Sequence, residues 1–439
     1  MFQRKLIAVL GLVTLLAFTA GVSQASKSRV EGMGLGIPTL SQYTDDYVNI
    51  YFYPTSVVRQ NNLVLAEMGN NPSGGVAPVG FSDQSFTIIR NFPRFGAIAY
   101  DMKATQLNDP FASNLTHHQL DLIWGKAFTK IDFAVRVDIT NSSFEETSSG
   151  GTVSFNKVSG DGFSPFDPYP FGGAFFPGAI ADFGVEMNTW GITPALAIHM
   201  QNDNRIEGAV TYRNYSLERT ESAAGVQGEK WEDDGSASYA VIARAIINQN
   251  DKHTWIPAGF YVNSDLSWAT TNVPAVGDSR SAEEKYKAYA VGISDNMKVN
   301  DNNLLLWGIQ LMESKHTFER GDAAVVAGET SKLEERFSST PIIFAALETD
   351  ATRWLKVRMG ASQSYISAKS EEVVFGAPAT TTTDEFHGSD FAFSLGTGIR
   401  WNNLDIDMTL NEKFPLSGGW VMSGDPSTPF TRASATYHF

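Results

Sequence analysis

From Lys130 to Thr140, apolar and polar residues alternate along the chain, and this pattern constrains the fold more than any other feature. Successive side chains of a β-strand point to opposite faces, so such a segment forms a strand with one apolar and one charged face. The apolar positions are Ile131, Phe133, Val135, Val137 and Ile139, and the others are Lys130, Asp132, Ala134, Arg136, Asp138 and Thr140. The pattern returns at 354–361, 390–400 and 403–410.

The connections between such segments have two lengths, which alternate along the chain. The short ones lie at 126–127, 201–204, 248–251, 300–303, 349–351 and 401–403. The long ones lie at 105–116, 145–178, 220–234, 271–283, 320–332, 371–387 and 414–428. Membrane barrels have tight turns at one end and long loops at the other. The sequence therefore predicts an all-β, transmembrane, antiparallel up-and-down β-barrel of about 16 strands, within about 14 to 18.

The predicted strands cover most of the chain after residue 61. They are 62–69, 83–91, 95–104, 117–126, 130–144, 181–199, 204–219, 235–248, 252–270, 284–297, 303–319, 333–348, 352–369, 386–400, 403–413 and 429–439. An even number of strands places both ends of the barrel on the side of the short turns. Several strands are longer than a membrane crossing needs, so we expect them to project beyond it as hairpins.

The first 25 residues have the features of a secretory signal peptide. Arg4 and Lys5 precede an apolar run over 6–20, and small residues occupy Ser23 and Ala25. This order predicts cleavage after Ala25. An N-terminal membrane anchor is the alternative, although the apolar run is short for a spanning helix. The chain then divides into an N-terminal segment (26–61) and the barrel (62–439).

The last strand ends the chain on an aromatic residue. Tyr437 and Phe439 fall on its apolar face together with Ala433 and Ala435. This ending resembles the C-terminal assembly signal of outer-membrane barrels. The resemblance implies recognition by the barrel-assembly machinery and residence among outer-membrane lipids of a Gram-negative bacterium. The long loops would then be extracellular and the short turns periplasmic.

Composition excludes several classes of function. The net charge of −15 argues against a nucleic-acid partner, because phosphate contacts need a basic surface. The chain has no cysteine, so disulfides and thiolate metal sites are absent. We find no HExxH, no Gly-x-Ser-x-Gly elbow and no phosphate-binding loop. We therefore expect no enzyme, no metal site and no cofactor.

Charged side chains on the non-apolar faces of the strands are the candidate functional residues. A charge facing lipid at mid-membrane costs about 2–4 kcal/mol, so these groups are expected to line the lumen. They are Lys130, Asp132, Arg136, Asp138, Arg213, Arg244, Lys356, Arg358, Arg400, Asp405 and Asp407. They favour a porin-like channel for passive transport of small polar solutes. The alternative is an internal salt-bridge network, although a barrel of about 16 strands is too wide for side chains alone to fill.

The predicted loop over 159–180 is unusually aromatic and rich in proline. It carries Phe163, Phe166, Tyr169, Phe171, Phe175 and Phe176. A loop of this composition is expected to pack rather than to extend into water. We expect it to constrict the lumen or cover the barrel rim, and binding of a hydrophobic ligand is the alternative.

The N-terminal segment contains Gly32-Met33-Gly34, then Asp45-Asp46, then the aromatic run 50–54. This order resembles the start of the long-chain fatty-acid transporter family. The resemblance implies that the segment forms a plug inside the barrel and that the substrate is hydrophobic. An ordinary first strand is the alternative for 26–61.

Two other functions therefore compete with the porin. One is a plugged transporter of hydrophobic compounds. The other is a structural or adhesive surface barrel that acts through its loops. The sequence shows no interface signature, so assembly into a homo-oligomer stays open.

Overall fold

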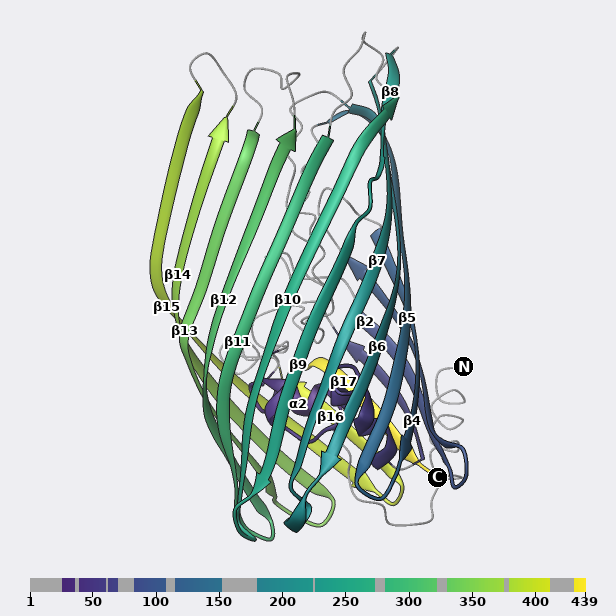
Figure 1. Cartoon of the computed structure of the whole chain (residues 1–439). Helices are drawn as coiled ribbons and strands as arrows, with labels where there is room; N and C mark the ends of the chain where they lie inside the picture. The colour runs from purple at the N-terminus through teal and green to yellow at the C-terminus, as the bar shows by residue number, and fades with distance from the viewer. Residues whose placement is uncertain are drawn as a thin grey trace, which may run out of the picture.

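A single antiparallel sheet closes on itself to form a barrel (Figure 1). The computed structural model describes residues 26–35, 39–60, 62–69, 83–107, 115–151, 180–223, 226–272, 281–321, 330–374, 379–410 and 430–439. The strands are β1 (Leu63–Gly69), β2 (Asp83–Phe92), β3 (Gly96–Leu107), β4 (Leu115–Ala127), β5 (Ile131–Gly151), β6 (Ile180–His199), β7 (Arg205–Ala223), β8 (Val226–Asp233), β9 (Ala237–Asn248), β10 (His253–Asn272), β11 (Ser281–Asn300), β12 (Asn303–Gly321), β13 (Thr330–Asp350), β14 (Leu355–Val374), β15 (Thr380–Trp401), β16 (Leu404–Leu410) and β17 (Phe430–His438). The first strand closes the barrel, because β1 pairs with both β2 and β17.

Two of these strands share one position in the wall. β8 and β9 both pair with β7 on one side and β10 on the other, one after the other along the barrel. The break between them contains Gly235, whose φ of +95° suits glycine. The wall is therefore a closed 16-strand barrel with one extra strand, which confirms the predicted fold.

Pairing extends further toward the long loops than the sequence suggested. The loop predicted over 220–234 is wrong for Val226–Asp233, which forms β8. The loop predicted over 371–387 is also too long, because β14 runs to Val374 and β15 begins at Thr380. These strand ends are mostly polar, so apolar alternation gives little sign of them. Backbone hydrogen bonding alone continues the hairpins.

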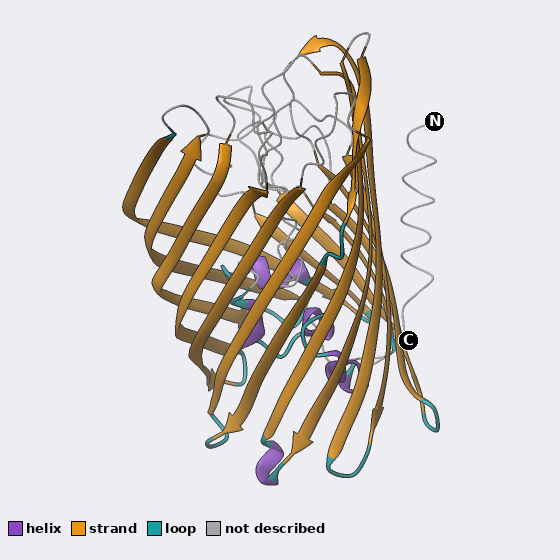
Figure 2. Cartoon of the chain, turned by 45° about the horizontal axis from the view of Figure 1, so that its top comes forward, coloured by secondary structure: helices purple, strands orange, loops and turns teal. Residues whose placement is uncertain are grey.

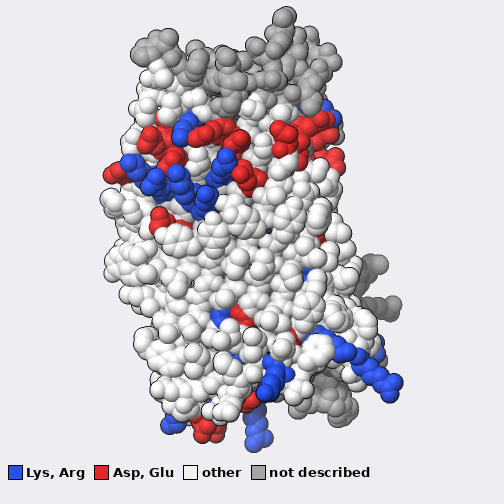
Figure 3. Space-filling view, viewed as in Figure 1, with Lys and Arg blue, Asp and Glu red and all other residues white. Residues whose placement is uncertain are grey.

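The outer face of the barrel is apolar. Large side chains at alternating strand positions are exposed, among them Ile139, Val210, Val291 and Trp307, at 49–55% of their full area. Figure 3 shows a mostly uncharged band between charged side chains near both ends. An apolar belt of this kind is stable against lipid hydrocarbon and unfavourable in water, so the barrel is of the transmembrane type. No helix among the described residues is long and apolar enough to cross a membrane.

The N-terminal segment lies inside the barrel near the short turns (Figures 1 and 2). Its helical elements are α2 (Lys27–Gly32) and three 3₁₀ turns, η1 (Ser41–Tyr43), η2 (Tyr47–Ile50) and η3 (Pro54–Arg59). Ser26 caps α2 by accepting a hydrogen bond from the Arg29 backbone N–H. Pro54 opens η3, where its missing N–H costs nothing. These described residues form short helices and not a strand.

Candidate functional site

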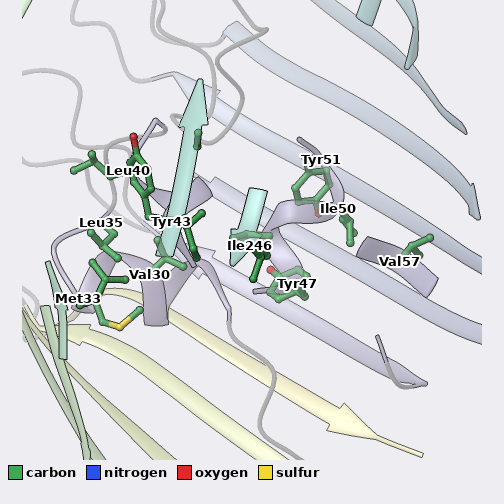
Figure 4. Close-up of a cluster of buried hydrophobic side chains, with 14 of the residues drawn as sticks. Val30, Met33, Leu35, Leu40, Tyr43, Tyr47, Ile50, Tyr51, Val57 and Ile246 are labelled. Atoms are coloured by element: carbon green, nitrogen blue, oxygen red, sulfur yellow. The ribbon is translucent and has the colours of Figure 1, made fainter. Parts of the chain in front are cut away.

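The occupied lumen is the candidate functional site, and an apolar cluster lies at its centre (Figure 4). From the N-terminal segment, the cluster takes Val30, Met33, Leu35, Leu40, Tyr43, Tyr47, Val48, Ile50, Tyr51 and Val57, all of them buried. The barrel wall contributes inward side chains such as Ile246, Ile256 and Phe344. The rings of Tyr43 and Phe344 stack with centroids 5.1 Å apart. The segment thus fits the wall by close apolar packing, which removes its aromatic residues from water.

A first group of ion pairs fixes α2 to the wall. Arg29 binds Glu348 of β13 in a bidentate pair, with Nε–Oε2 at 2.6 Å and Nη2–Oε1 at 2.9 Å, and also pairs with Asp46. Glu348 accepts a second arginine, because Arg358 Nε lies 2.6 Å from Oε2. Arg358 Nη1 in turn donates to Asp407 Oδ1 at 2.7 Å. Two of the predicted charges, Arg358 and Asp407, therefore act together with a partner on the N-terminal segment.

Asp407 also binds the start of the segment. Its Oδ2 accepts a hydrogen bond from Ser26 Oγ at 2.9 Å. Next to it, the Lys27 backbone N–H donates to Glu67 Oε1 at 2.8 Å, and Arg432 Nε donates to Glu31 Oε1 at 2.8 Å. The wall strands β1, β16 and β17 thus hold both ends of α2.

A second group surrounds Glu207 of β7. Glu207 Oε1 lies 2.6 Å from Arg244 Nη2, and its Oε2 lies 2.9 Å from Arg59 Nη2. Arg244 also donates to the backbone carbonyls of Gln42 and Thr44, at 2.6 and 2.7 Å. Its guanidinium lies 4.3 Å above the Tyr53 ring, a cation–π distance. Arg244, predicted to line the lumen, therefore binds two backbone carbonyls and one aromatic ring of the segment.

A third group of polar contacts lies between the wall and the end of η2. Arg136 Nε binds Asp121 Oδ1 at 2.6 Å, and its Nη1 donates to the Tyr51 carbonyl at 3.0 Å. Lys103 Nζ lies 3.9 Å from the centre of the Tyr51 ring. Two further residues predicted to line the lumen, Arg213 and Asp138, pair with each other on the same wall, with Nη2–Oδ2 at 2.8 Å.

The burial of the segment shifts the ionisation of its own groups. Desolvation raises the pKa of the Tyr47 and Tyr51 hydroxyls well above the ordinary value. Asp45 is half-exposed, and its partial desolvation works against the ionised form. Arg205, Arg59 and Arg244 outweigh it and hold the pKa of Asp45 below its usual value. Asp45 therefore carries its charge at neutral pH and ties the segment to β7 and β9.

The remaining predicted charges occupy three environments. Asp132 is buried and pairs with His199 at 2.8 Å and with Arg59 at 3.6 Å. Lys356 is partly exposed and lies 3.1 Å from Asp350. Arg400 Nε donates to Asp405 Oδ1 at 3.0 Å.

The prediction for Lys130 is wrong. This residue is exposed in the turn between β4 and β5, and β5 begins only at Ile131. Alternation continues by chance one residue into the turn, where side-chain direction no longer follows the strand period.

Two further predictions concern other parts of the chain. The aromatic residues Phe163, Phe166, Tyr169, Phe171, Phe175 and Phe176 lie outside the described residues. Phe439 follows β17 and is 52% exposed, and Tyr437 is partly exposed on the outer side. Their role as an assembly signal stays a prediction.

Sequence reasoning missed the groups that complete the ion pairs. Glu207 and Glu348 lie in strands predicted correctly, and each is a charged residue among apolar neighbours, so alternation could have found both. Arg29 gives no such signal, because its partner Glu348 is 319 residues away in sequence.

One side of the inner wall is apolar. The inward residues of β10 include Ile256, Ala258, Phe260, Val262, Leu266 and Trp268, which extend from the N-terminal segment toward the long loops. Phe52 and Tyr53 pack against part of this strip. The lumen therefore combines a charged side, around β3–β7, with an apolar side at β10. Among the described residues, no group of His, Asp and Glu could hold a metal ion.

Comparison with known proteins gives matches in fold only. No protein-family model matches the chain, and no curated protein matches it. A Pseudomonas aeruginosa FadL homologue aligns over 96% of this chain and 100% of its own, with 10% identity and a TM-score of 0.46. The CymD monoaromatic hydrocarbon channel aligns over 94% and 97%, with 10% identity and a TM-score of 0.39. The ferric citrate transporter FecA aligns over 80% and 66%, with 8% identity and a TM-score of 0.40.

Proposed function

We propose that this protein is an outer-membrane transport barrel that residues 26–60 close at rest, and that it passes small hydrophobic compounds. One observation carries the proposal: the N-terminal segment lies within the lumen, with its apolar side chains buried against the wall. Transport by such a barrel needs no chemical step. Passage requires the segment to shift or leave.

The inward charges favour closure over an open polar pore. Arg136, Arg244 and Arg358 are 2% exposed or less, and each contacts the segment or the residue that holds it. A polar solute would have to compete with these contacts and would gain no free charge from the wall. The same charges would line the lumen if the segment left, so a porin for polar solutes is the second candidate function.

The apolar strip on β10 supports a hydrophobic cargo. Phe260, Leu266 and Trp268 face inward on a strand whose outer face also carries large side chains such as Tyr261. A wall that contacts only water and polar solutes has no use for such residues. Apolar pocket walls with few polar groups are typical of sites for small hydrophobic ligands.

Two measurements test the proposal. Planar bilayers with the full-length protein should show almost no conductance, and a variant with weakened docking, Glu207→Ala, should show long openings. In cells, the protein should speed uptake of an apolar fluorescent dye and leave uptake of a sugar of similar mass unchanged.

A pair of variants at Phe260 supplies the control. Phe260→Asn places an amide in the apolar strip and should slow dye uptake about tenfold, a loss that corresponds to ~1.4 kcal/mol. Phe260→Leu keeps the strip apolar and should retain most uptake. A full-length protein that conducts steadily and admits sugar as fast as dye would establish the porin instead.

A further inference from the structure

A row of cations crosses four neighbouring strands on the outer face of the barrel. Lys287 of β11 pairs in register with Lys315 of β12, Lys315 with Arg336 of β13, and Arg336 with Lys369 of β14. Neighbouring strands lie about 4.8 Å apart, so the four charges fall within about 15 Å. Like charges directly opposite each other destabilise a sheet. A row of four is therefore stable only with anions beside it.

The row lies where the apolar belt ends. Two positions nearer the short turns, the outer face carries tyrosines, namely Tyr289 on β11 and, beside it, Tyr261 on β10. Tyr212 and Tyr239 continue this series on β7 and β9, with 43% and 48% exposure. Aromatic girdles mark the membrane–water interface of such barrels. The cations thus lie at the level of lipid headgroups, on the side of the long loops.

Nearby acids leave the row accessible to a further anion. Glu334 lies two positions nearer the loops than Arg336 and pairs with Lys315 at 3.0 Å and with Arg336 at 2.9 Å. Glu283 lies four positions nearer the loops than Lys287 and pairs with Lys285 at 2.5 Å, and Glu385 of β15 pairs with Lys369 at 3.5 Å. Acids thus pair with Lys315, Arg336 and Lys369. On the membrane side of Lys315, Glu313 accepts a hydrogen bond from the Tyr289 hydroxyl. Exposed ion pairs of this kind contribute little to stability. Replacing the carboxylate of such a pair with a phosphate group therefore costs little free energy. Among the described residues, Lys287 has no carboxylate within ion-pair distance.

A hollow brings the lysines together. It has a volume of about 220 Å³ and is lined by Glu283, Lys285, Lys287, Lys315, Thr317 and Glu319. Figure 3 shows blue side chains gathered along the upper margin of the uncharged band. Three ammonium groups and a hydroxyl line this hollow beside two glutamates, which pair with Lys285 and Lys332. These donors match the needs of a phosphate monoester, which accepts several charge-assisted hydrogen bonds.

We propose that this row, together with Lys285, binds the phosphate groups of a lipid in the leaflet nearest the long loops. The acyl chains would lie on the apolar belt below Tyr289, and the phosphate would enter the hollow from the membrane side. The site is separate from the lumen, so it holds whether or not the N-terminal segment blocks transport.

Native mass spectrometry of the folded protein in neutral detergent tests the proposal. The probe is bisphosphorylated lipid A, compared with its dephosphorylated form and with inorganic phosphate. We expect retention of the phosphorylated lipid alone, because binding draws on both the acyl chains and the phosphate. The triple variant Lys285→Gln, Lys287→Gln, Lys315→Gln should lose about tenfold or more in affinity, given the attraction of each cation to an anionic headgroup.

The matched control removes three cations at the other end of the barrel. Lys130, Lys252 and Lys298 are exposed near the short turns, and their change to glutamine alters the net charge equally. This control should bind the lipid as the unchanged protein does. The single variant Lys287→Gln, which breaks no ion pair among the described residues, should lose about threefold and covers the case in which the triple variant does not fold.

Three results would overturn the proposal. Equal retention of the dephosphorylated lipid would show that only the acyl chains bind. An equal loss of lipid affinity in the control variant of the short turns would show an effect of net charge. A triple variant that keeps the lipid but changes in oligomeric mass would assign the row to contact between copies of the chain.

Discussion

The two sides of the lumen hold the N-terminal segment by different physics. On β3–β7, Arg136 donates a hydrogen bond to the Tyr51 carbonyl of the segment, and Glu207 accepts one from Arg59. On the other side, Ile256 of β10 and Phe344 of β13 give apolar contact, while Glu348 of β13 belongs to the ion pairs that hold Arg29. Directional pairs set where the segment lies, because they are strong in one geometry. Apolar contact gives free energy in proportion to area and tolerates displacement.

The largest expected effect is loss of a central charge on the charged side. Glu207→Ala leaves the buried Arg244 without its nearest carboxylate, and loss of one partner of a buried pair costs about 3–5 kcal/mol. We expect the segment to undock, which hydrogen exchange over 26–60 and bilayer conductance would measure. Asp251→Ala, in an exposed turn, serves as the control and should change neither. Unchanged exchange in Glu207→Ala would mean that the charged side does not hold the segment.

Truncation on the apolar side should cost less and depend on different conditions. Phe344→Ala removes a buried ring that stacks on Tyr43, and such truncations cost about 3 kcal/mol. Because no charge is involved, the loss in stability toward urea should be the same at low and high salt. A strong salt dependence would contradict the division into two sides. Phe344→Leu is the matched variant and should lose about 1 kcal/mol.

A smaller effect is expected where the backbone of β14 touches the backbone of the N-terminal segment. A Cβ on Gly360 of β14 would collide with the Met33 carbonyl of the segment. Gly360→Ala should therefore displace the end of α2 at a cost of about 1–3 kcal/mol. Faster hydrogen exchange of the backbone amides near Met33, with unchanged exchange in the barrel wall, would confirm this displacement. Gly208→Ala meets its nearest atom only at 3.2 Å and should be milder.

The smallest effect is a dependence on pH. The pKa of Asp45 lies below its ordinary value because Arg205, Arg59 and Arg244 outweigh its partial desolvation. The stabilisation from this group is complete above the ordinary value of about 3.9, and it is lost as pH falls through the lowered pKa. The contribution of Asp45 to closure should therefore be equal at pH 7 and 5, and its loss should raise conductance only below about pH 4. Asp45→Asn should abolish the contribution of Asp45 to that rise, and an unchanged rise would assign it to other carboxyl groups.

The predicted barrel agrees with the structure because the alternation can be seen within each strand, while its cause, the lipid around the barrel, is the same for all strands. Each strand must turn apolar side chains to lipid, so the period-2 pattern repeats in every crossing, as in 130–140. The same pattern identified Arg136, Arg244 and Arg358 as inward residues. It failed where local rules change, as at Lys130 in a turn and at Val226–Asp233, where polar strands pair beyond the apolar belt.

The sequence by itself determined the class of fold, the direction of most charged side chains and the outer apolar surface, because each follows from side-chain spacing within one strand. Only the tertiary structure decided what those charges contact. Arg29 meets Glu348 and Ser26 meets Asp407 across separations of 319 and 381 residues, after the barrel has closed. The row from Lys287 to Lys369 likewise depends on the register of four strands. Register and enclosure are properties of the closed sheet, and no local pattern encodes them.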